Sequence, residues 1–393
     1  MNPATPPPTT PQPTRRTDVA VIGGGIAGLW CARRLADAGY GVVLFERGHT
    51  GGVQTLGSQG IIHGGLKYSL SGTLSRATAA ISAMPERWRA CLSGCGEIDL
   101  TTATIRTQRY AMFAGSGFSN RLTGLVASQA LRGRVLNLER AHWPDAFHGF
   151  TGQLWQLDDL VVDVASVCQA LANHPGVRLY SGVASLRESA DGWRVASNGF
   201  ELSADVIVAA AGLGNEQLID QAGIDDVPTQ RRGLCQLIVR SEDEPLPELN
   251  GHCITGVRGS EPRLSITSHD DGATRLWTVG GRLATRGAAL SDREFLTEAR
   301  SELEHCLPWL DLSRASLSTW RVDRAEPAQH RGLRPDDACV IARRNLLLCW
   351  PSKLTLAPSL GDQVLDAARR IAPPSGDQPT LDLDAPAFGR PPW

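Results

Sequence analysis

The chain has 393 residues, of which 42% are hydrophobic, and its 39 basic residues nearly balance its 41 acidic residues. A balanced charge argues against nucleic acid or an anionic membrane surface as a partner. The length suits two or three domains, or one large α/β unit with an insertion. Nine cysteines without a CxxC pair favour reduced thiols over a disulfide framework, so we expect a cytoplasmic protein.

Residues 1–15 contain many prolines and lack the apolar core of a signal peptide. Because proline also prevents a continuous helix, we expect a disordered leader here. No uninterrupted apolar run in the chain approaches the length that spans a bilayer. The sequence therefore predicts no integral membrane segment.

The first folded stretch changes its hydrophobic period twice. Asp18 to Ile22 are typical of a buried strand, Gly23 to Gly28 of a tight turn, and Ala27 to Ala38 of a helix. Gly39 ends that helix, and Val42 to Phe45 predict a second buried strand. Strand, helix and strand in this order form a βαβ unit, which predicts a parallel sheet.

The turn of this unit has a dinucleotide-binding pattern. Gly23, Gly25 and Gly28 have the G-x-G-x-x-G spacing, which makes a tight turn, lets a pyrophosphate approach the backbone and lets helix and strand pack closely. Glu46 follows 18 residues after Gly28, where an acceptor for a ribose hydroxyl is needed and an acid opposes a 2′-phosphate. The alternative is a glycine-rich turn without a ligand, but this complete context favours a dinucleotide. We expect the same site to include Ile26, Ala27 and Arg47.

Later segments return to the same sheet. Residues 203–215 predict another buried parallel strand that ends in glycines, and residues 160–202 predict a helix, a strand and a short hairpin. Residues 345–371 predict a strand, a loop and a helix. By contrast, the alternating patterns in residues 95–155 and 225–322 indicate an antiparallel sheet in a second, inserted domain.

After residues 1–15, most of the sequence resembles the FAD-dependent oxidoreductases of the D-amino-acid oxidase superfamily, and the resemblance is strongest at both ends. The resemblance is carried by "VIGGGIAG" at 21–28, "ADVIVAAAG" at 204–212 and the C-terminal strand, loop and helix. Within that superfamily, "IIHGGLKY" at 61–68, "RGLRP" at 331–335 and "SKLTLAPSLGDQVL" at 352–365 are similar to FAD-linked glycerol-3-phosphate dehydrogenases. The first of these is also similar to the "IH-G-Y" pattern of L-2-hydroxyglutarate oxidases. Trp350, Pro351 and Ser352 replace glycines of the dehydrogenase pattern.

The resemblance implies an α/β fold with a discontinuous Rossmann-type FAD-binding domain and an inserted, mostly antiparallel α+β substrate domain. We expect residues 16–94, 156–222 and 323–375 to form the FAD-binding domain. Residues 95–155 and 223–322 are expected to form the substrate domain, followed by a tail at 376–393.

The resemblance also implies which residues contact FAD and substrate. His63 is a candidate proton acceptor, because the ordinary pKa of imidazole lies near neutrality; it could equally hydrogen-bond only the flavin or the backbone. Arg334 is a candidate anchor for a carboxylate or phosphate, since its planar fork binds such groups bidentately. Lys353, just before the last helix, is expected to stabilise negative charge on the flavin together with the helix dipole. The further residues expected to bind FAD are Gly64, Gly65, Val183, Ala211, Gly212, Leu354 and Thr355. Lys67 and Tyr68 follow on the His63 loop.

The implied function is an FAD-dependent oxidoreductase that takes hydride from a small anionic substrate, such as a 2-hydroxy acid or a polyol phosphate. An amine or amino-acid oxidase of the same superfamily, or a flavin-binding module without turnover, are the alternatives. No second G-x-G-x-x-G and no histidine pair with metal-ligand spacing occur. We therefore expect oxygen or a quinone as the electron acceptor, and no metal.

Overall fold

The computed structural model describes most of the chain, and every structural statement below refers to this part. The described residues are 15–65, 81–115, 135–197, 200–241, 243–254, 261–270, 272, 274–329, 335 and 337–393.

The first sheet contains the predicted βαβ unit. Its strands β1 (Arg15–Ile22) and β2 (Val42–Glu46) are parallel and are joined by helix α1 (Ile26–Asp37). They lie in the order β10-β11-β12-β1-β2-β9, and β19 also pairs with β12. The remaining members are β9 (Val177–Ser181), β10 (Ser185–Ser189), β11 (Gly192–Ser197), β12 (Phe200–Ala209), β18 (Cys339–Arg343) and β19 (Leu346–Trp350). Each of the three chain segments that the sequence assigned to this sheet contributes strands to it.

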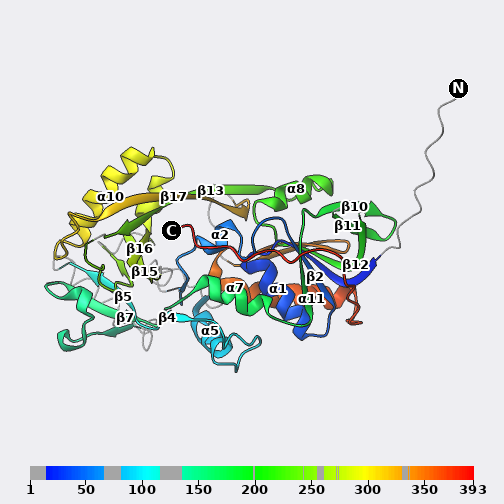
Figure 1. Ribbon diagram of the computed structural model, residues 1–393, viewed down its shortest axis with the longest axis horizontal. Helices are drawn as coiled ribbons and strands as arrows, with labels where there is room; N and C mark the ends of the chain where they lie inside the picture. The colour runs from blue at the N-terminus through cyan, green and yellow to red at the C-terminus, as the bar shows by residue number, and fades with distance from the viewer. Residues whose placement is uncertain are drawn as a thin grey trace.

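Successive side chains of the central strands are apolar on both faces, as in a parallel sheet that is covered on both sides. Val19, Val21, Val42 and Leu44 face one core together with helices α1, α5 (Met84–Leu92), α7 (Val164–Ala172) and α11 (Ala357–Ile371). Their neighbours Ala20, Ile22, Val43 and Phe45 face a second core with α8 (Gly214–Gln221). Figure 1 shows α1, α7 and α11 side by side along the first sheet.

The second sheet is mostly antiparallel, in the order β17-β13-β16-β15-β14-β5-β7-β6, and only its β14–β5 pair is parallel. Its strands are β5 (Tyr110–Ala114), β6 (Val135–Asn137), β7 (Gln153–Leu157), β13 (Thr229–Arg240), β14 (Gly251–Cys253), β15 (Leu264–Asp270), β16 (Arg275–Gly280) and β17 (Ser316–Pro327). Helices α9 (Arg282–Gly287) and α10 (Asp292–Cys306) accompany it. The predicted second, mostly antiparallel sheet is therefore present.

Two features link the halves of the molecule. The β13–β17 ribbon extends from the second sheet towards α8 (Figure 1), so β17 continues past residue 322, where the sequence placed a boundary. A small sheet has the strand order β3-β8-β4. In the chain, its strands adjoin strands of both large sheets. It consists of β3 (Ile61–Ile62), β4 (Ile105–Thr107) and β8 (Leu160–Val162). Short helical segments complete the described elements: α2 (Val53–Leu56), η3 (Arg140–His142), η4 (Asp145–Phe147) and η6 (Leu354–Leu356).

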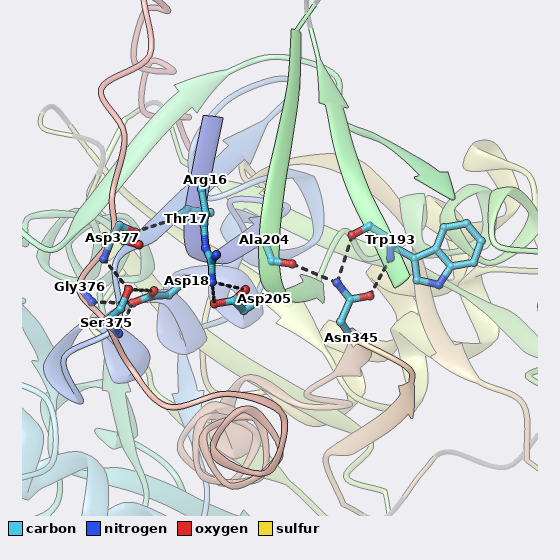
Figure 2. A network of polar contacts seen from close by, with 10 residues as sticks. All are labelled: Arg16, Thr17, Asp18, Trp193, Ala204, Asp205, Asn345, Ser375, Gly376 and Asp377. Carbon is cyan, nitrogen blue, oxygen red and sulfur yellow. Dashed lines mark hydrogen bonds and ion pairs between the residues drawn. The ribbon is translucent and has the colours of Figure 1, made fainter. Parts of the chain in front are cut away.

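The C-terminal segment is packed against the first sheet. Asp18 on β1 accepts hydrogen bonds from the Ser375 hydroxyl and from the N–H groups of Ser375 and Gly376 (Figure 2). Burial alone would raise the pKa of Asp18, but the hydrogen bonds from Ser375, Gly41 and Gly376 outweigh it and lower the pKa. The segment then continues along the sheet edge, where Ser181 N–H donates to Asp384 C=O over 2.7 Å. It ends with Trp393 against His269 of the second sheet, at a ring-centroid distance of 4.6 Å.

A second polar contact in Figure 2 joins the hairpin before the last helix to the first sheet. The Asn345 side chain accepts from Trp193 N–H over 2.8 Å and donates to the carbonyls of Trp193 and Ala204. These bonds fix β19 beside β12, which places the segment after β19 at the carboxyl edge of the sheet.

Candidate functional site

The glycine turn has the close contacts that its spacing predicts. Gly23 has a φ of 108°, and a Cβ there would lie 2.6 Å from the Ala210 carbonyl oxygen. A Cβ on Gly28 would lie 1.8 Å from the Gly23 oxygen, so helix and strand approach as closely as glycine allows. Gly25 precedes the first residue of α1, and the adjacent Ile26 and Ala27 are buried. The turn therefore presents backbone, without side chains, at a helix N-terminus.

Glu46 lies beside this turn, at the end of β2. One carboxylate oxygen accepts from Gly24 N–H over 2.6 Å and the other from Gly48 N–H over 2.7 Å. Only 9% of the residue is exposed. Because each carboxylate oxygen can accept more than one hydrogen bond, Glu46 keeps capacity for a ribose hydroxyl.

Residues from other strands meet the same edge of the sheet. Ala211 and Gly212 follow β12; a Cβ on Gly23 would lie 2.7 Å from Ala211 Cα, and Ala211 N–H donates to Asn215 Oδ1 over 2.9 Å. The fully buried Asn215 also donates to the Cys349 carbonyl of β19, so it ties two strand ends together. The sequence analysis did not identify Asn215, although its place at the start of a helix after "AAAGLG" is a usable signal.

Arg47 and Val183 both lie next to Glu46 at the end of β2. Gly182 N–H donates to the Glu46 carbonyl over 2.9 Å, which places Val183 next to the end of β2. Val183 is 61% exposed, and Arg47 is also exposed. Val183 therefore presents an exposed apolar side chain next to Glu46.

His63 and the last loop of the chain are brought together. The N–H of His63 donates to Thr355 Oγ1 over 3.2 Å, and the Thr355 carbonyl accepts from the buried Trp88 indole over 3.1 Å. Gly64 N–H donates to the carboxylate of Asp159 over 2.8 Å. Gly65 has a φ of 77°, a conformation that favours glycine. His63, Gly64, Gly65, Leu354 and Thr355 thus belong to one cluster.

Lys353 enters this cluster through an unusual turn. Its N–H donates to the Pro351 carbonyl over 2.6 Å, and Ser352 between them has a φ of 60°. A three-residue turn with positive φ is rare and strained for a residue with a side chain. Ser352 is one of the residues that replace glycines of the resembled pattern, so the backbone has kept a conformation that suits glycine. Lys353 itself is 5% exposed.

The second sheet turns one polar face towards this cluster. On β15 the apolar Leu264 and Ile266 belong to the core of that half, while Ser265, Thr267 and His269 alternate with them. Gln236 on β13 likewise lies between the core residues Cys235 and Leu237. Gln59, from the loop before His63, donates to the carbonyls of Ser265 and Thr278 over 2.8 and 2.9 Å.

These contacts identify residues that sequence reasoning missed. Asp159 accepts from Gly64 of the His63 loop, Gln59 of the same loop donates to the second sheet, and Gln236 donates to the first residue of the loop, Gly57. The alternation of polar and apolar residues on β13 and β15 could have indicated a polar face, but not what it meets. Arg334, Lys67 and Tyr68 lie outside the described residues.

The residues present fit a bound dinucleotide with a flat ring. Near the glycine turn and the His63 cluster, three buried oxygens of the described residues have no hydrogen-bond partner in the protein. They are Thr50 Oγ1, Ser58 Oγ and Gln236 Oε1. Buried polar atoms normally have partners, so atoms of this kind indicate a ligand or water beside them. The glycine turn, Glu46 and the His63 cluster would then hold the two ends of one extended group.

Three further findings concern the described residues as a whole. None of their helices combines the length and the apolar composition needed to cross a membrane. Within the same residues, no three or more His, Cys, Asp or Glu side chains gather as a metal ion would require. All nine cysteines are free thiols, most of them buried, and burial raises the pKa of Cys91 to about 12.

Comparison with known proteins agrees with this geometry. The family model described as FAD dependent oxidoreductase (DAO) matches residues 18–366. The probable FAD-dependent oxidoreductase PA4991 of Pseudomonas aeruginosa is 40% identical over 383 residues, which cover 96% of each chain. The crystal structure of PA4991 has a TM-score of 0.83 at 35% identity and covers 98% of this chain and 99% of that chain.

Glycine oxidases are more distant relatives. The enzyme of Bacillus licheniformis is 29% identical over 226 residues, which cover 54% of this chain and 58% of that protein. The structure of glycine oxidase from Geobacillus kaustophilus has a TM-score of 0.67 at 17% identity, covering 94% of this chain and 97% of that chain, and so shares the fold.

Proposed function

Because this chain belongs to the DAO family of FAD-dependent oxidoreductases, we propose that it dehydrogenates a small anionic substrate at a C–H bond next to nitrogen or oxygen. FAD is its cofactor, as the family and the overall identity to PA4991 show. One observation carries the proposed site: the His63 cluster, which includes Thr355, lies against the polar face of the second sheet. Bound FAD supplies the two-electron acceptor for the hydride.

We assign the dinucleotide end of FAD to the glycine turn. The backbone at Gly23, Gly25 and Gly28 and the N-terminus of α1 would bind the pyrophosphate, because the turn lacks side chains and the helix dipole favours anions. Glu46 would accept from the ribose, with Ala211 and Gly212 alongside. The first sheet would form the FAD-binding domain, and the second sheet the substrate domain.

We assign the reacting end to the His63 cluster. His63 is half-buried and its backbone N–H donates to Thr355, and we assign to its imidazole the role of accepting a proton from the substrate. Lys353 is buried in front of the N-terminus of α11, where its charge and the helix dipole favour an anion. The proposed carboxylate or phosphate anchor is Arg334.

An amine substrate, such as an amino acid, is the first candidate. The glycine oxidase of Bacillus licheniformis supports this candidate, since its 29% identity over 226 residues extends well beyond a motif. The second candidate is a 2-hydroxy acid or polyol phosphate. It is favoured by the similarity of residues 61–68 and 352–365 to FAD-linked glycerol-3-phosphate dehydrogenases. We expect oxygen or a quinone to reoxidise the cofactor in either case.

Anaerobic reduction of the bound cofactor separates these candidates. The purified holoenzyme is mixed with amino acids, secondary amines, 2-hydroxy acids and polyol phosphates, and loss of the yellow absorbance is recorded. Bleaching by amines alone supports the first candidate, and bleaching by hydroxy acids or polyol phosphates alone supports the second. If no member of the panel reduces the cofactor, the proposed function is wrong.

A further inference from the structure

The segment that carries His63, residues 57–65 (the His63 segment), contains four glycines and yet has a defined place. Glycines at 57, 60, 64 and 65 give its backbone unusual freedom, which must be lost for the segment to be ordered. Contacts from outside the segment therefore have to fix it. Those at its C-terminal end come from Thr355 and Asp159. Those at its N-terminal end come from the second sheet.

Gln59 is inserted into the second sheet. Its Nε2 donates to the Ser265 carbonyl on β15 and to the Thr278 carbonyl on β16, over 2.8 and 2.9 Å. The space for this side chain exists because Gly280 has no side chain: a Cβ there would lie 2.4 Å from Gln59 Oε1. The contact is thus matched in hydrogen bonding and in shape.

Gln236 holds the start of the segment in the same way. Its Nε2 donates to the Gly57 carbonyl over 3.0 Å, which fixes the orientation of the amide because only nitrogen can donate. The ring of Trp320, opposite Gln236 on β17, lies so close to Gly57 that a Cβ would be 1.8 Å from it. Gly57 is therefore enclosed between an amide and an indole of the second sheet.

We propose that Gln59 and Gln236 are positioning residues, which fix the His63 segment against the second sheet and so set the place of His63 relative to the substrate. Neither residue needs to touch the reacting atoms. The functional consequence rests on the role proposed above for His63, whereas the structural part, that these amides order the segment, does not.

The chain offers a matched control for Gln59. Gln378, in the C-terminal segment, also donates from Nε2 to two backbone carbonyls, those of Val42 on β2 and of Gly176 just before β9, over 2.8 and 2.9 Å. Gln378→Ala therefore removes two hydrogen bonds of the same kind, but at a site away from His63. Gln59→Glu is a second test, because it keeps the shape but places carboxylate oxygens against two carbonyl acceptors.

Hydrogen–deuterium exchange of the holoenzyme tests the structural part without any substrate. Gln59→Ala and Gln236→Ala should accelerate amide exchange in peptides covering residues 57–65, and Gln378→Ala should accelerate it around residues 40–46 and 374–384 instead. Unchanged exchange of the His63 segment in Gln59→Ala would overturn the inference, even if the enzyme's substrate is unknown.

Single-turnover reduction of the bound FAD tests the functional part. With a substrate found in the panel above, Gln59→Ala and Gln59→Glu should reduce the cofactor about 10- to 100-fold more slowly at saturating substrate, while FAD occupancy stays at the wild-type level. An equal slowing by Gln378→Ala would show a general loss of stability and refute the positioning role. If Gln59→Ala does not fold, Gly280→Ala is used: it should displace Gln59 and accelerate exchange of residues 57–65, and unchanged exchange would again refute the inference.

Discussion

The N–H of Gly64 donates to the buried carboxylate of Asp159 over 2.8 Å, directly after His63 in the chain. Asp159 is 4% exposed and lies in the turn between β7 and β8. A buried carboxylate that accepts a backbone N–H fixes that part of the backbone, because leaving either group without its partner costs free energy. The contact adds to the pairing of β3, within the His63 segment, with β8 in the small sheet.

Asp159→Ala should therefore lower the free energy of unfolding by about 1–3 kcal/mol. The adjacent Asp158 is the control: its side chain is 43% exposed and pairs with Arg89 at the surface. Such pairs contribute about 0–1 kcal/mol, so Asp158→Ala should cost less. Denaturant unfolding of both variants with excess FAD makes the comparison. Equal decreases in the free energy of unfolding would show that the buried contact stabilises the protein no more than the exposed ion pair does.

Gly28→Ala should damage both cofactor binding and stability. The added Cβ would lie 1.8 Å from the Gly23 oxygen, and backbone has to move to make room. Overpacking of this kind costs about 1–3 kcal/mol, and here it distorts the turn proposed to bind the pyrophosphate. The ratio of FAD to protein after purification and the denaturation midpoint give the two readouts.

Gly115→Ala is the control for that substitution, because a Cβ there meets no atom within 4 Å and its φ is not in the left-handed region. It should retain FAD and stability. A Gly28→Ala protein with full FAD content would contradict the assignment of the turn.

The backbone at Ser352 predicts a difference between two substitutions. Ser352→Gly and Ser352→Ala both lose the hydroxyl that donates to the Asp337 carbonyl over 2.9 Å. Only the glycine variant relieves the positive φ of 60°, which costs a residue with a Cβ about 1–2 kcal/mol. Denaturant unfolding should thus find Ser352→Gly more stable than Ser352→Ala by about 1 kcal/mol. An alanine variant of equal or greater stability would show that the turn before Lys353 is not strained.

His269 predicts part of the pH dependence of stability. Burial lowers its pKa to about 3 in the folded protein, where its Nε2 lies 2.9 Å from Thr278 Oγ1. In the unfolded chain the ordinary value is about 6.5. The unfolded state therefore binds more protons between these two values, and the free energy of unfolding falls as the pH is lowered from about 6.5 towards 3.

His269→Gln should make this loss shallower, and the exposed His305 provides the control, since His305→Gln leaves the buried imidazole in place. Denaturant unfolding at about pH 7 and about pH 5 measures the slope for each protein. If His269→Gln shows the same slope as the wild type, His269 is not the buried neutral group responsible.

Local patterns in the sequence predicted the fold well where neighbouring residues decide it. The strand, glycine turn, helix and acid of residues 18–46 form as expected because their hydrophobic periods and glycines act within a few residues. The sequence also predicted a proline in the first turn of the last helix, and Pro358 occupies the first turn of α11.

The contacts that complete the site depend on residues far apart in the chain. Gln59 and Thr278 are separated by 219 positions, and nothing near Gln59 indicates that a glycine on β16 leaves room for it. Similarly, residues 376–393 have the composition of a tail, and their partners, among them Asp18, Thr50 and His269, lie far away in the chain. Periodicity can show which strand face is polar, but not which segment meets that face.

The central claim is that this chain dehydrogenates a small anionic substrate through the His63 cluster. Its most direct test is anaerobic, single-turnover reduction of the bound FAD in wild-type and His63→Ala proteins, with FAD occupancy measured in the same samples. The account predicts that His63→Ala slows reduction by about 100-fold or more, in the range of general acid–base catalysis, while FAD occupancy is unchanged. Equal reduction rates in the two proteins would contradict it.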